Sequence, residues 1–372
     1  MRELLSHLEN HASAMLGDLE RLVRLESPSS DRARINVVQD VNAEWFGPMG
    51  EVSRHAGECG DLLHVRIPGA STDRILLLAH VDTVYPVGSW NQVWQSEGEK
   101  ALGPGTYDMK GGIVQATWAL RALQALGRRP ARTVDLLLTP DEEIGSDAAR
   151  PFIEDMARGA WAVLVLEPPD MNGNLKIARK GVGDYTIHIS GRSAHQGVEP
   201  EKGRNAIVSA AHLIRELVQL QDLEKGTTLG PNVIHGGTVS NVVPDEVVLK
   251  VDVRVWDLAA AARVDAAMRS IKPLDGTRYN ISGGLNRPPM EPSEGTMKLL
   301  EKAQALAQQI GFNVGAARVG GGSDGNFTSK LAPTLDGFGA MGAHAHQRDL
   351  EYVHIPSLVP RTALLAGMLI EA

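Results

Sequence analysis

The sequence has little cysteine, no strongly basic stretch and no long hydrophobic run, and each absence excludes a class of protein. Its 372 residues include a single cysteine, Cys59, which excludes an internal disulfide framework and favours a reducing compartment. The formal net charge is -8 and no basic stripe stands out, which disfavours a nucleic-acid partner.

Membrane association is also disfavoured. No apolar run reaches the ~18 residues that a membrane-spanning helix requires. Residues 1–23 carry charges every few positions and are typical of an amphipathic helix, without the uninterrupted apolar stretch of a signal peptide. We therefore expect a cytoplasmic protein.

What the sequence does contain is 43% hydrophobic residues and enough length for two domains. Almost purely apolar runs at 75–79, 134–138 and 162–166 predict strands that are buried on both faces, as in a mostly parallel sheet. Helical patterns at 112–126 and 147–157 lie between these runs. This alternation predicts an α/β domain.

The hydrophobic pattern changes in the second half of the chain. The segments DYTIHISG and EVVLKVDVRVWD alternate apolar and polar residues, and helical patterns follow them at 203–219 and 259–271. The order β-α-β-β-α-β with one polar face predicts a small ferredoxin-like α+β domain. We expect this domain, at 179–288, to be inserted into a discontinuous domain formed by 1–178 and 289–372.

Acidic and imidazole side chains follow each predicted buried strand. They are His80 and Asp82 after the first strand, Asp141, Glu142 and Glu143 after the second, and Glu167 after the third; Asp108 lies in the turn GPGTYDMKGG, and His344 and His346 lie near the C-terminus. Taken singly, each has an ordinary explanation, such as an acidic helix N-terminus. Together, at one edge of a parallel sheet, they would crowd negative charge into one cleft, and divalent cations would relieve the repulsion. Imidazole and carboxylate without thiolate favour zinc, cobalt or manganese over calcium.

Ordered motifs extend over nearly the whole chain: HVD at 80–82, GPGTYDMKGG, TPDEEIGS, LEPP, GRSAHQG, GTVSNVVP, GGGSDGNF and HAHQRDLEYV. Together they resemble the dinuclear zinc amidohydrolases, a family that includes acetylornithine deacetylase, succinyl-diaminopimelate desuccinylase, aminoacylase and glutamate carboxypeptidases. The stretches HVDTVYPVG and DLEYVHIPS are most similar to the folate-cleaving glutamate carboxypeptidase branch.

The resemblance implies two zinc ions per chain, for which cobalt or manganese could substitute. Asp108 would bridge both ions, with His80 and Glu167 completing one site and Glu143 and His346 the other. The segment GAHAHQ also offers His344, but the family spacing to Glu351 selects His346. The resemblance further implies a cis peptide bond between Asp108 and Met109.

The same resemblance assigns the catalytic roles. Asp82 would hold the second imidazole nitrogen of His80, which fixes its tautomer and raises its basicity as a ligand. Glu142 would be the general base: it would take a proton from a zinc-bridging water, and the hydroxide would attack a carbonyl polarised by zinc. Glu142 would then pass the proton to the leaving amine.

The resemblance places substrate-binding residues in the inserted domain and the loop after it. His195 would stabilise the oxyanion across a homodimer interface formed by the inserted domain, although a solvent-exposed turn histidine is an alternative explanation. Asn241 would contact the substrate beside His195, and Arg254 would pair with the substrate carboxylate. Arg287 is a weaker second candidate. Gly322 would donate a backbone N–H to the same carboxylate, or would simply belong to a flexible loop.

We therefore expect a zinc-dependent carboxypeptidase that releases a C-terminal amino acid, such as glutamate, from a peptide, folyl or N-acyl conjugate. An N-acyl amino acid deacylase, such as an acetylornithine deacetylase or desuccinylase, is the alternative within the family. A non-catalytic binding module is disfavoured by the presence of Glu142 beside a full set of ligands. A dinuclear phosphatase or lactonase would leave Arg254 and His195 without a role.

Overall fold

The computed structural model describes residues 1–371 and divides into two compact units. The first unit comprises Met1–Ala178, Pro292–Val319 and the chain from Ser323 onward. The second comprises Arg179–Glu291 and the short segment Gly320–Gly322, which the sequence analysis placed in the first domain. Hydrogen bonds also connect Gly321 and Gly322 to this unit, because Arg179 Nη1 donates to their carbonyls, at 3.2 and 2.9 Å.

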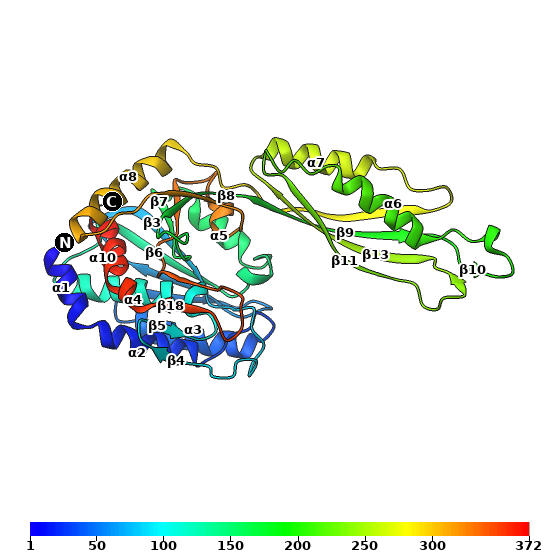
Figure 1. The fold of residues 1–372 in the computed structure, drawn as a ribbon. Coiled ribbons are helices and arrows are strands. Elements are labelled where there is room, and N and C mark those ends of the chain that lie inside the picture. The colour runs from blue at the N-terminus through cyan, green and yellow to red at the C-terminus, as the bar shows by residue number, and fades with distance from the viewer. Residues whose placement is uncertain (372) are drawn as a thin grey trace. The chain divides into compact units, whose positions relative to one another are not determined.

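An eight-stranded sheet forms the centre of the first unit (Figure 1). Its order is β1 (Glu51–His55), β2 (Leu62–Ile67), β6 (Arg132–Thr139), β3 (Ser71–His80), β7 (Ala162–Val165), β16 (Thr334–Asp336), β8 (Leu175–Arg179) and β15 (Ala316–Val319). The central strands β6, β3, β7 and β16 are parallel, whereas β1, β2 and β8 pair antiparallel with their neighbours. The predicted α/β class with a mostly parallel sheet is therefore confirmed.

Helices cover both faces of this sheet. One core cluster joins Ile75 and Leu77 of β3 to α1 (Arg2–Asn10), α2 (Ala12–Val23), α3 (Arg32–Phe46), α4 (Gly111–Ala125), α8 (Glu294–Ile310) and α10 (Ile355–Glu371). Leu76 and Leu78 pack on the opposite side, with α5 (Arg150–Ala157) and α9 (Gly325–Thr328). Alternate residues of β3 are thus buried in different clusters, which explains why this strand lacks an alternating pattern.

A small second sheet connects distant parts of the first unit. Its order is β17 (Gly342–Ala343), β18 (Tyr352–His354), β5 (Lys100–Leu102) and β4 (Gln95–Glu97). The pairing of β18 with β5 brings the C-terminal loop 344–351 next to the chain that leads into the short, kinked turn Thr106–Lys110. This contact positions two segments of the candidate site that lie far apart in sequence.

The second unit is an antiparallel sheet covered by two helices. The sheet order is β11 (Thr228–Gly236), β13 (Glu246–Val255), β9 (Gly181–Ser190) and β14 (Arg278–Arg287). Helices α6 (Ala206–Val218) and α7 (Leu258–Ser270) pack on one face and begin at side-chain caps, Asn205 and Asp257. The order β-α-β-β-α-β is the one that the alternating pattern predicted.

Shorter elements complete the description of residues 1–371. They are the 3-10 turns Glu142–Ile144 and Pro200–Lys202 and the paired strands β10 (Ala194–His195) and β12 (Val242–Val243). Within the described residues, no helix is long and apolar enough to cross a membrane.

Candidate active site

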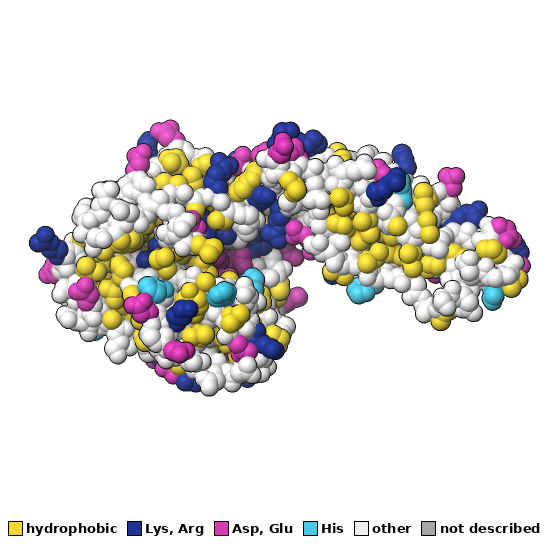
Figure 2. All heavy atoms as spheres, viewed as in Figure 1, with side chains coloured by type: hydrophobic (Ala, Val, Ile, Leu, Met, Phe, Trp, Pro, Cys, Tyr) yellow, Lys and Arg dark blue, Asp and Glu magenta, His cyan; other side chains and the backbone are white. Residues whose placement is uncertain are grey.

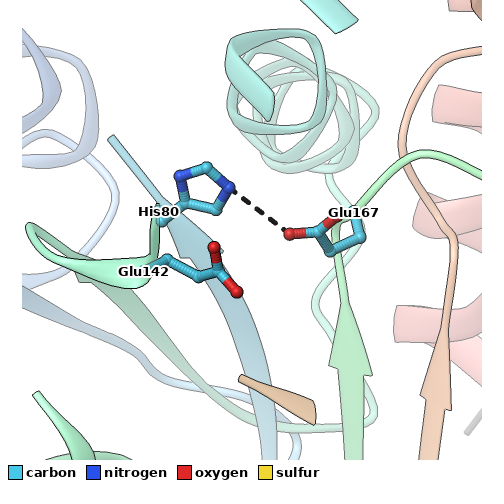
Figure 3. A group of neighbouring side chains, drawn as sticks. All are labelled: His80, Glu142 and Glu167. Carbon is cyan, nitrogen blue, oxygen red and sulfur yellow. Dashed lines mark ion pairs between the residues drawn. The ribbon is translucent and has the colours of Figure 1, made fainter. Parts of the chain in front are cut away.

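The carboxyl ends of the central strands carry the predicted metal ligands. His80 is the last residue of β3, the Glu142–Ile144 turn follows β6, and Glu167 follows β7. Figure 3 shows the side chains of His80, Glu142 and Glu167 pointing toward one another from these ends. Asp108 reaches the same place from the turn before α4, where the Asp108–Met109 peptide is cis, as expected.

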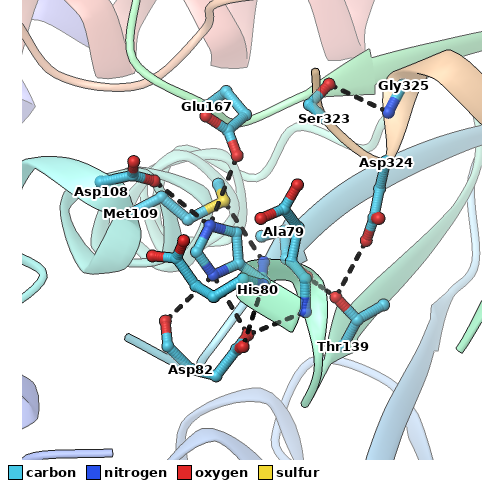
Figure 4. A network of polar contacts seen from close by, with 12 residues as sticks. Ala79, His80, Asp82, Asp108, Met109, Thr139, Glu167, Ser323, Asp324 and Gly325 are labelled. Atoms are coloured by element: carbon cyan, nitrogen blue, oxygen red, sulfur yellow. Dashed lines mark hydrogen bonds and ion pairs between the residues drawn. The ribbon is translucent and has the colours of Figure 1, made fainter. Parts of the chain in front are cut away.

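His80 is buried between three carboxylates. Its Nε2 lies 3.2 Å from Asp108 Oδ1 and 3.3 Å from Glu167 Oε1. On the other side of the ring, Nδ1 lies 3.0 Å from the carbonyl oxygen of Asp82 and 3.3 Å from its Oδ1 (Figure 4). Burial alone would lower the pKa of His80, but its contacts with these carboxylates raise that pKa well above its usual value.

His346 forms a second, matching group with Asp108. Its Nε2 lies 3.1 Å from Glu143 Oε2 and 3.4 Å from Asp108 Oδ2. Contacts with Asp108 and Glu143 raise the pKa of His346 to about 11. The other candidate, His344, contacts Gln347 instead, with 3.2 Å between its Nδ1 and the amide oxygen. The two oxygens of Asp108 therefore face the two different imidazoles.

Asp82 connects His80 to the turn that carries the two glutamates. Its Oδ1 accepts the backbone N–H of Glu142 and its Oδ2 accepts that of Glu143, each at 3.1 Å. Oδ2 also accepts the Ser29 hydroxyl at 2.7 Å. This buried carboxylate therefore orients both the imidazole of His80 and the backbone of Glu142.

The donor set fits divalent transition metals. Ligand atoms of His80, Glu142 and Glu167 lie within 4.8 Å of one another, as do those of His80, Asp108 and Glu143. Burial and the nearby charge of Asp108 raise the pKa of Glu143 to about 7, although His346 opposes this shift. The clustered carboxylates thus require positive charge, which protonated imidazole or a bound cation can supply. Nitrogen and oxygen donors without thiolate suit zinc, cobalt or manganese.

Glu351 is a supporting residue to which sequence reasoning assigned no role beyond marking a spacing. Its Oε1 accepts the backbone N–H groups of Tyr107 and Asp108, at 3.0 and 3.1 Å. Its Oε2 accepts the Tyr85 hydroxyl at 2.7 Å. Because two of these donors belong to the backbone, no residue type in the sequence could have indicated the contacts. Burial and the charge of Asp108 raise the pKa of Glu351 to about 7.

The predicted substrate-binding residues all lie in the second unit, in two groups. Arg254 and Arg287 both pair in register with Val182 of β9, so the three residues form one row across β13, β9 and β14. Gly322 joins this row, because a Cβ on it would lie 2.8 Å from Val182 and 3.0 Å from Arg287. Arg254 also donates to Asp252, with 2.8 Å between Nη2 and Oδ2.

His195 and Asn241 form the other group. His195 pairs with Val242 in the β10–β12 ladder, and the N–H of Gln196 donates to the Asn241 carbonyl at 2.9 Å. This ladder lies past the end of the sheet where β9 finishes and β13 begins, whereas Arg254 lies at the other end of β13 (Figure 1). At ~3.3 Å per residue, the eight residue-to-residue steps from Glu246 to Arg254 separate the groups by about 26 Å or more.

Comparisons with known proteins agree on one family. Residues 76–371 match the peptidase family M20/M25/M40. The chain is 31% identical to carboxypeptidase G2 from Pseudomonas sp. (strain RS-16), over 96% of this chain and 88% of that protein. It is 30% identical to the succinyl-diaminopimelate desuccinylase of Stenotrophomonas maltophilia (strain R551-3), over 81% of this chain and 84% of that protein.

Solved structures show the same fold. Aminopeptidase PepT from Bacillus cereus superposes with a TM-score of 0.79 at 22% identity, over 96% of this chain and 98% of that one. The metallo-carboxypeptidase Sso-CP2 from Sulfolobus solfataricus superposes with a TM-score of 0.78 at 16% identity, over 95% of this chain and 98% of that one. At these identities the likeness concerns the fold alone.

Proposed function

The chain belongs to peptidase family M20/M25/M40, whose members hydrolyse amide bonds, and we propose that it is a zinc carboxypeptidase that releases a C-terminal glutamate from a peptide, folyl or N-acyl conjugate. That it is a metal-dependent hydrolase follows from the family. The proposal for this substrate rests on one observation: two arginines share a row of the second unit, in a chain whose other unit carries the His80–Asp108–His346 cluster.

Two zinc ions would be held by residues of the first unit. His80, Glu167 and one oxygen of Asp108 would hold the first ion, and His346, Glu143 and the other oxygen of Asp108 the second. When bound, such ions polarise the amide carbonyl and lower the pKa of the attacking water. Asp82 would keep Nδ1 of His80 protonated, so that Nε2 faces the ion.

Glu142 would move the proton during the reaction. Its carboxylate would accept a proton from the attacking water and afterwards donate it to the nitrogen of the leaving amino acid. Two features support this role: its oxygen lies in the same cluster as His80 and Glu167, and Asp82 holds its backbone. Glu143, the next residue, faces His346 instead and is therefore suited to a different task.

Arg254 and Arg287 would bind the carboxylates of the leaving glutamate. Guanidinium groups bind carboxylates through two parallel hydrogen bonds, and neighbouring strands lie ~4.8 Å apart, so two arginines two strands apart can contact the two carboxylates of one small molecule. Gly322 would add a backbone N–H, since its missing side chain lets the loop approach Arg287 closely.

His195 and Asn241 would serve the active site of a partner subunit. Because they lie about 26 Å or more from Arg254 along the same sheet, one small substrate cannot contact both groups of one chain. We therefore propose a homodimer in which the second unit pairs with its twin. The edge strand β11 and helix α6 support this arrangement, since Ile207, Val208 and Ile234 are exposed there. Figure 2 shows hydrophobic side chains on the visible face of this unit.

A panel of substrates tests the proposal. Zinc-loaded protein should release glutamate from folyl-glutamate and N-acyl-glutamate faster than it releases a neutral amino acid from matched conjugates. Chelation should abolish the release, and zinc, cobalt or manganese should restore it. Preference for N-succinyl-diaminopimelate would instead support the desuccinylase alternative, which the similarity to the Stenotrophomonas maltophilia desuccinylase suggests. A metal-loaded protein that hydrolyses none of these amides would contradict both.

A further inference from the structure

The turn that carries Glu142 is held at both ends by one buried carboxylate, Asp324. Thr139, the last residue of β6, donates its hydroxyl to Asp324 Oδ2 at 3.1 Å (Figure 4). Ser146, directly after the turn, donates its hydroxyl to the other oxygen, Oδ1. Asp324 is 3% exposed and lines the same small cavity as His80, Glu142 and Glu167.

The residues next to Asp324 are held by buried contacts. It lies at the start of α9, where Phe327 is buried in the core between α5 and the sheet. The preceding residue, Ser323, donates to Asp336 of β16 at 2.8 Å and accepts the N–H of Gly325 at 3.1 Å. Asp324 therefore ties the turn after β6 to a neighbouring part of the sheet, 178 residues away from Ser146 in the chain.

We propose that Asp324 is a positioning residue for the general base: by binding the Thr139 and Ser146 hydroxyls, it fixes the turn from which Glu142 acts. This inference rests on the proposed function. Within the turn, Glu143 would also be held by its metal ion, whereas Glu142 depends on the backbone and on its neighbours for its position. Misplacing a catalytic group by ~1 Å can lower the rate by about 10²-fold.

Steady-state kinetics and zinc titration of the full-length protein, in the oligomeric state in which it is purified, test this positioning role of Asp324. Asp324→Ala should lower kcat by about 10–100-fold, while KM stays within about two-fold and zinc affinity is unchanged. Asp324→Asn should recover most of the lost kcat, because an amide can still bind both hydroxyls. The double variant Thr139→Val/Ser146→Ala should lower kcat to a similar extent. Adding Asp324→Ala to this double variant should lower kcat little further.

Two further variants separate a positioning role from general destabilisation. Thr328→Val removes another buried hydroxyl contact, to Thr334 at 2.8 Å, and should leave kcat unchanged. In a Glu142→Gln background, Asp324→Ala should have little further effect on the residual kcat, because the group that it positions is gone.

Three results would overturn the inference. The first is weakened zinc binding or a raised KM in Asp324→Ala. The second is that Asp324→Ala lowers the residual kcat of Glu142→Gln as strongly as it lowers the kcat of the wild type. The third, if Asp324→Ala does not fold, is wild-type kcat in Thr139→Val/Ser146→Ala. High activity in Glu142→Gln alone would contradict the proposed role of Glu142 as the base, and zinc-loaded wild-type protein that hydrolyses none of the amides would contradict the proposed function; each is a separate failure.

Discussion

Single carboxylates perform several tasks in this site. Asp108 faces two imidazoles with its two oxygens, and Asp82 contacts one imidazole and two backbone N–H groups. Burial would raise the pKa of Asp108, but His346 and His80 outweigh it and hold that pKa well below its usual range. A substitution at either aspartate would therefore disturb several contacts at once.

Glu142→Gln should abolish most turnover while the protein still folds and binds zinc. The amide keeps the size of the side chain but cannot accept and return a proton, and general-base help contributes typically about 10²–10⁴-fold. Steady-state kinetics and metal analysis of the purified variant check this expectation. If the variant kept near-wild-type kcat, Glu142 would not be the base and Glu143 would need to be tested in its place.

Glu351 should determine how tightly zinc binds, because it holds the backbone of Asp108. Glu351→Leu should weaken zinc affinity by about 10–100-fold, as is typical when a residue that orients a ligand is lost. Glu351→Gln should bind nearly as well as the wild type, since its amide oxygen can accept both N–H groups. Competitive titration with a chelator measures both affinities, and Tyr85→Phe, which loses one contact, is the control. Equal affinities for the leucine variant and wild type would refute this role.

At the scale of secondary structure, polar contacts between strands supplement the apolar packing of the sheet. Asp135 lies in β6, which is flanked by β2 and β3. It contacts His64 Nε2 and Arg66 Nε of β2 at 2.8 and 2.9 Å, and Arg74 Nη1 of β3 at 3.0 Å. Burial raises the pKa of Asp135, but the hydrogen bonds with these three partners lower it by more. The pKa therefore lies well below its usual value of 3.8.

Asp135→Asn should lower the free energy of unfolding by about 1–3 kcal/mol at neutral pH, because charged hydrogen bonds to a buried group are lost. Because the folded-state pKa lies below the usual 3.8, this stabilisation is complete above 3.8, begins to weaken below it, and is lost only as the pH falls through the lower, folded-state pKa. The difference between variant and wild type should therefore shrink below about pH 4. Urea unfolding at pH 7 and pH 3.5 measures it, and a difference that did not depend on pH would contradict the electrostatic explanation.

At the scale of the whole molecule, the proposed assignment of both Arg254 and His195 to substrate binding would require more than one chain. The metal cluster belongs to the first unit, and the second unit carries Arg254 and His195 at opposite ends of its sheet. Only one of these ends can serve a given small substrate, so the other end would serve a second copy of the chain. This gives a structural reason for the symmetric dimer that the family resemblance implies.

Mixing two inactive variants tests the shared site. Glu142→Gln and His195→Ala homodimers should each be nearly inactive, but a heterodimer contains one site with an intact Glu142 and a borrowed His195. Random exchange of subunits should therefore restore about one quarter of wild-type activity. Activity and native mass spectrometry after exchange measure recovery and heterodimer content. Heterodimers without recovered activity, or a protein that is monomeric in solution, would contradict the shared site.

The sequence by itself determined the architecture of the first unit and the residue types of its cluster. The apolar runs at 75–79, 134–138 and 162–166 lie in β3, β6 and in and just after β7, because strands buried on both faces need apolar residues at every position. Since a parallel sheet gathers the carboxyl ends of its strands, polar residues that follow each run meet at one edge. The alternating pattern of β9 and β13 likewise indicated one covered face.

Tertiary structure alone decided which groups support the cluster. Glu351 acts on backbone N–H groups and Asp324 on hydroxyls from distant segments, so neither contact has a local sequence pattern. The same holds for Gly320–Gly322, a segment of the second unit in which Arg179 binds the carbonyls of Gly321 and Gly322. Arg254 and Arg287 lie in one row because of the register in which β13 and β14 pair with β9. The separation of this row from His195 depends on the same long-range pairing. Hydrogen bonds between residues far apart in the chain form only after the sheet has brought them together, and the order of residue types therefore does not reveal them.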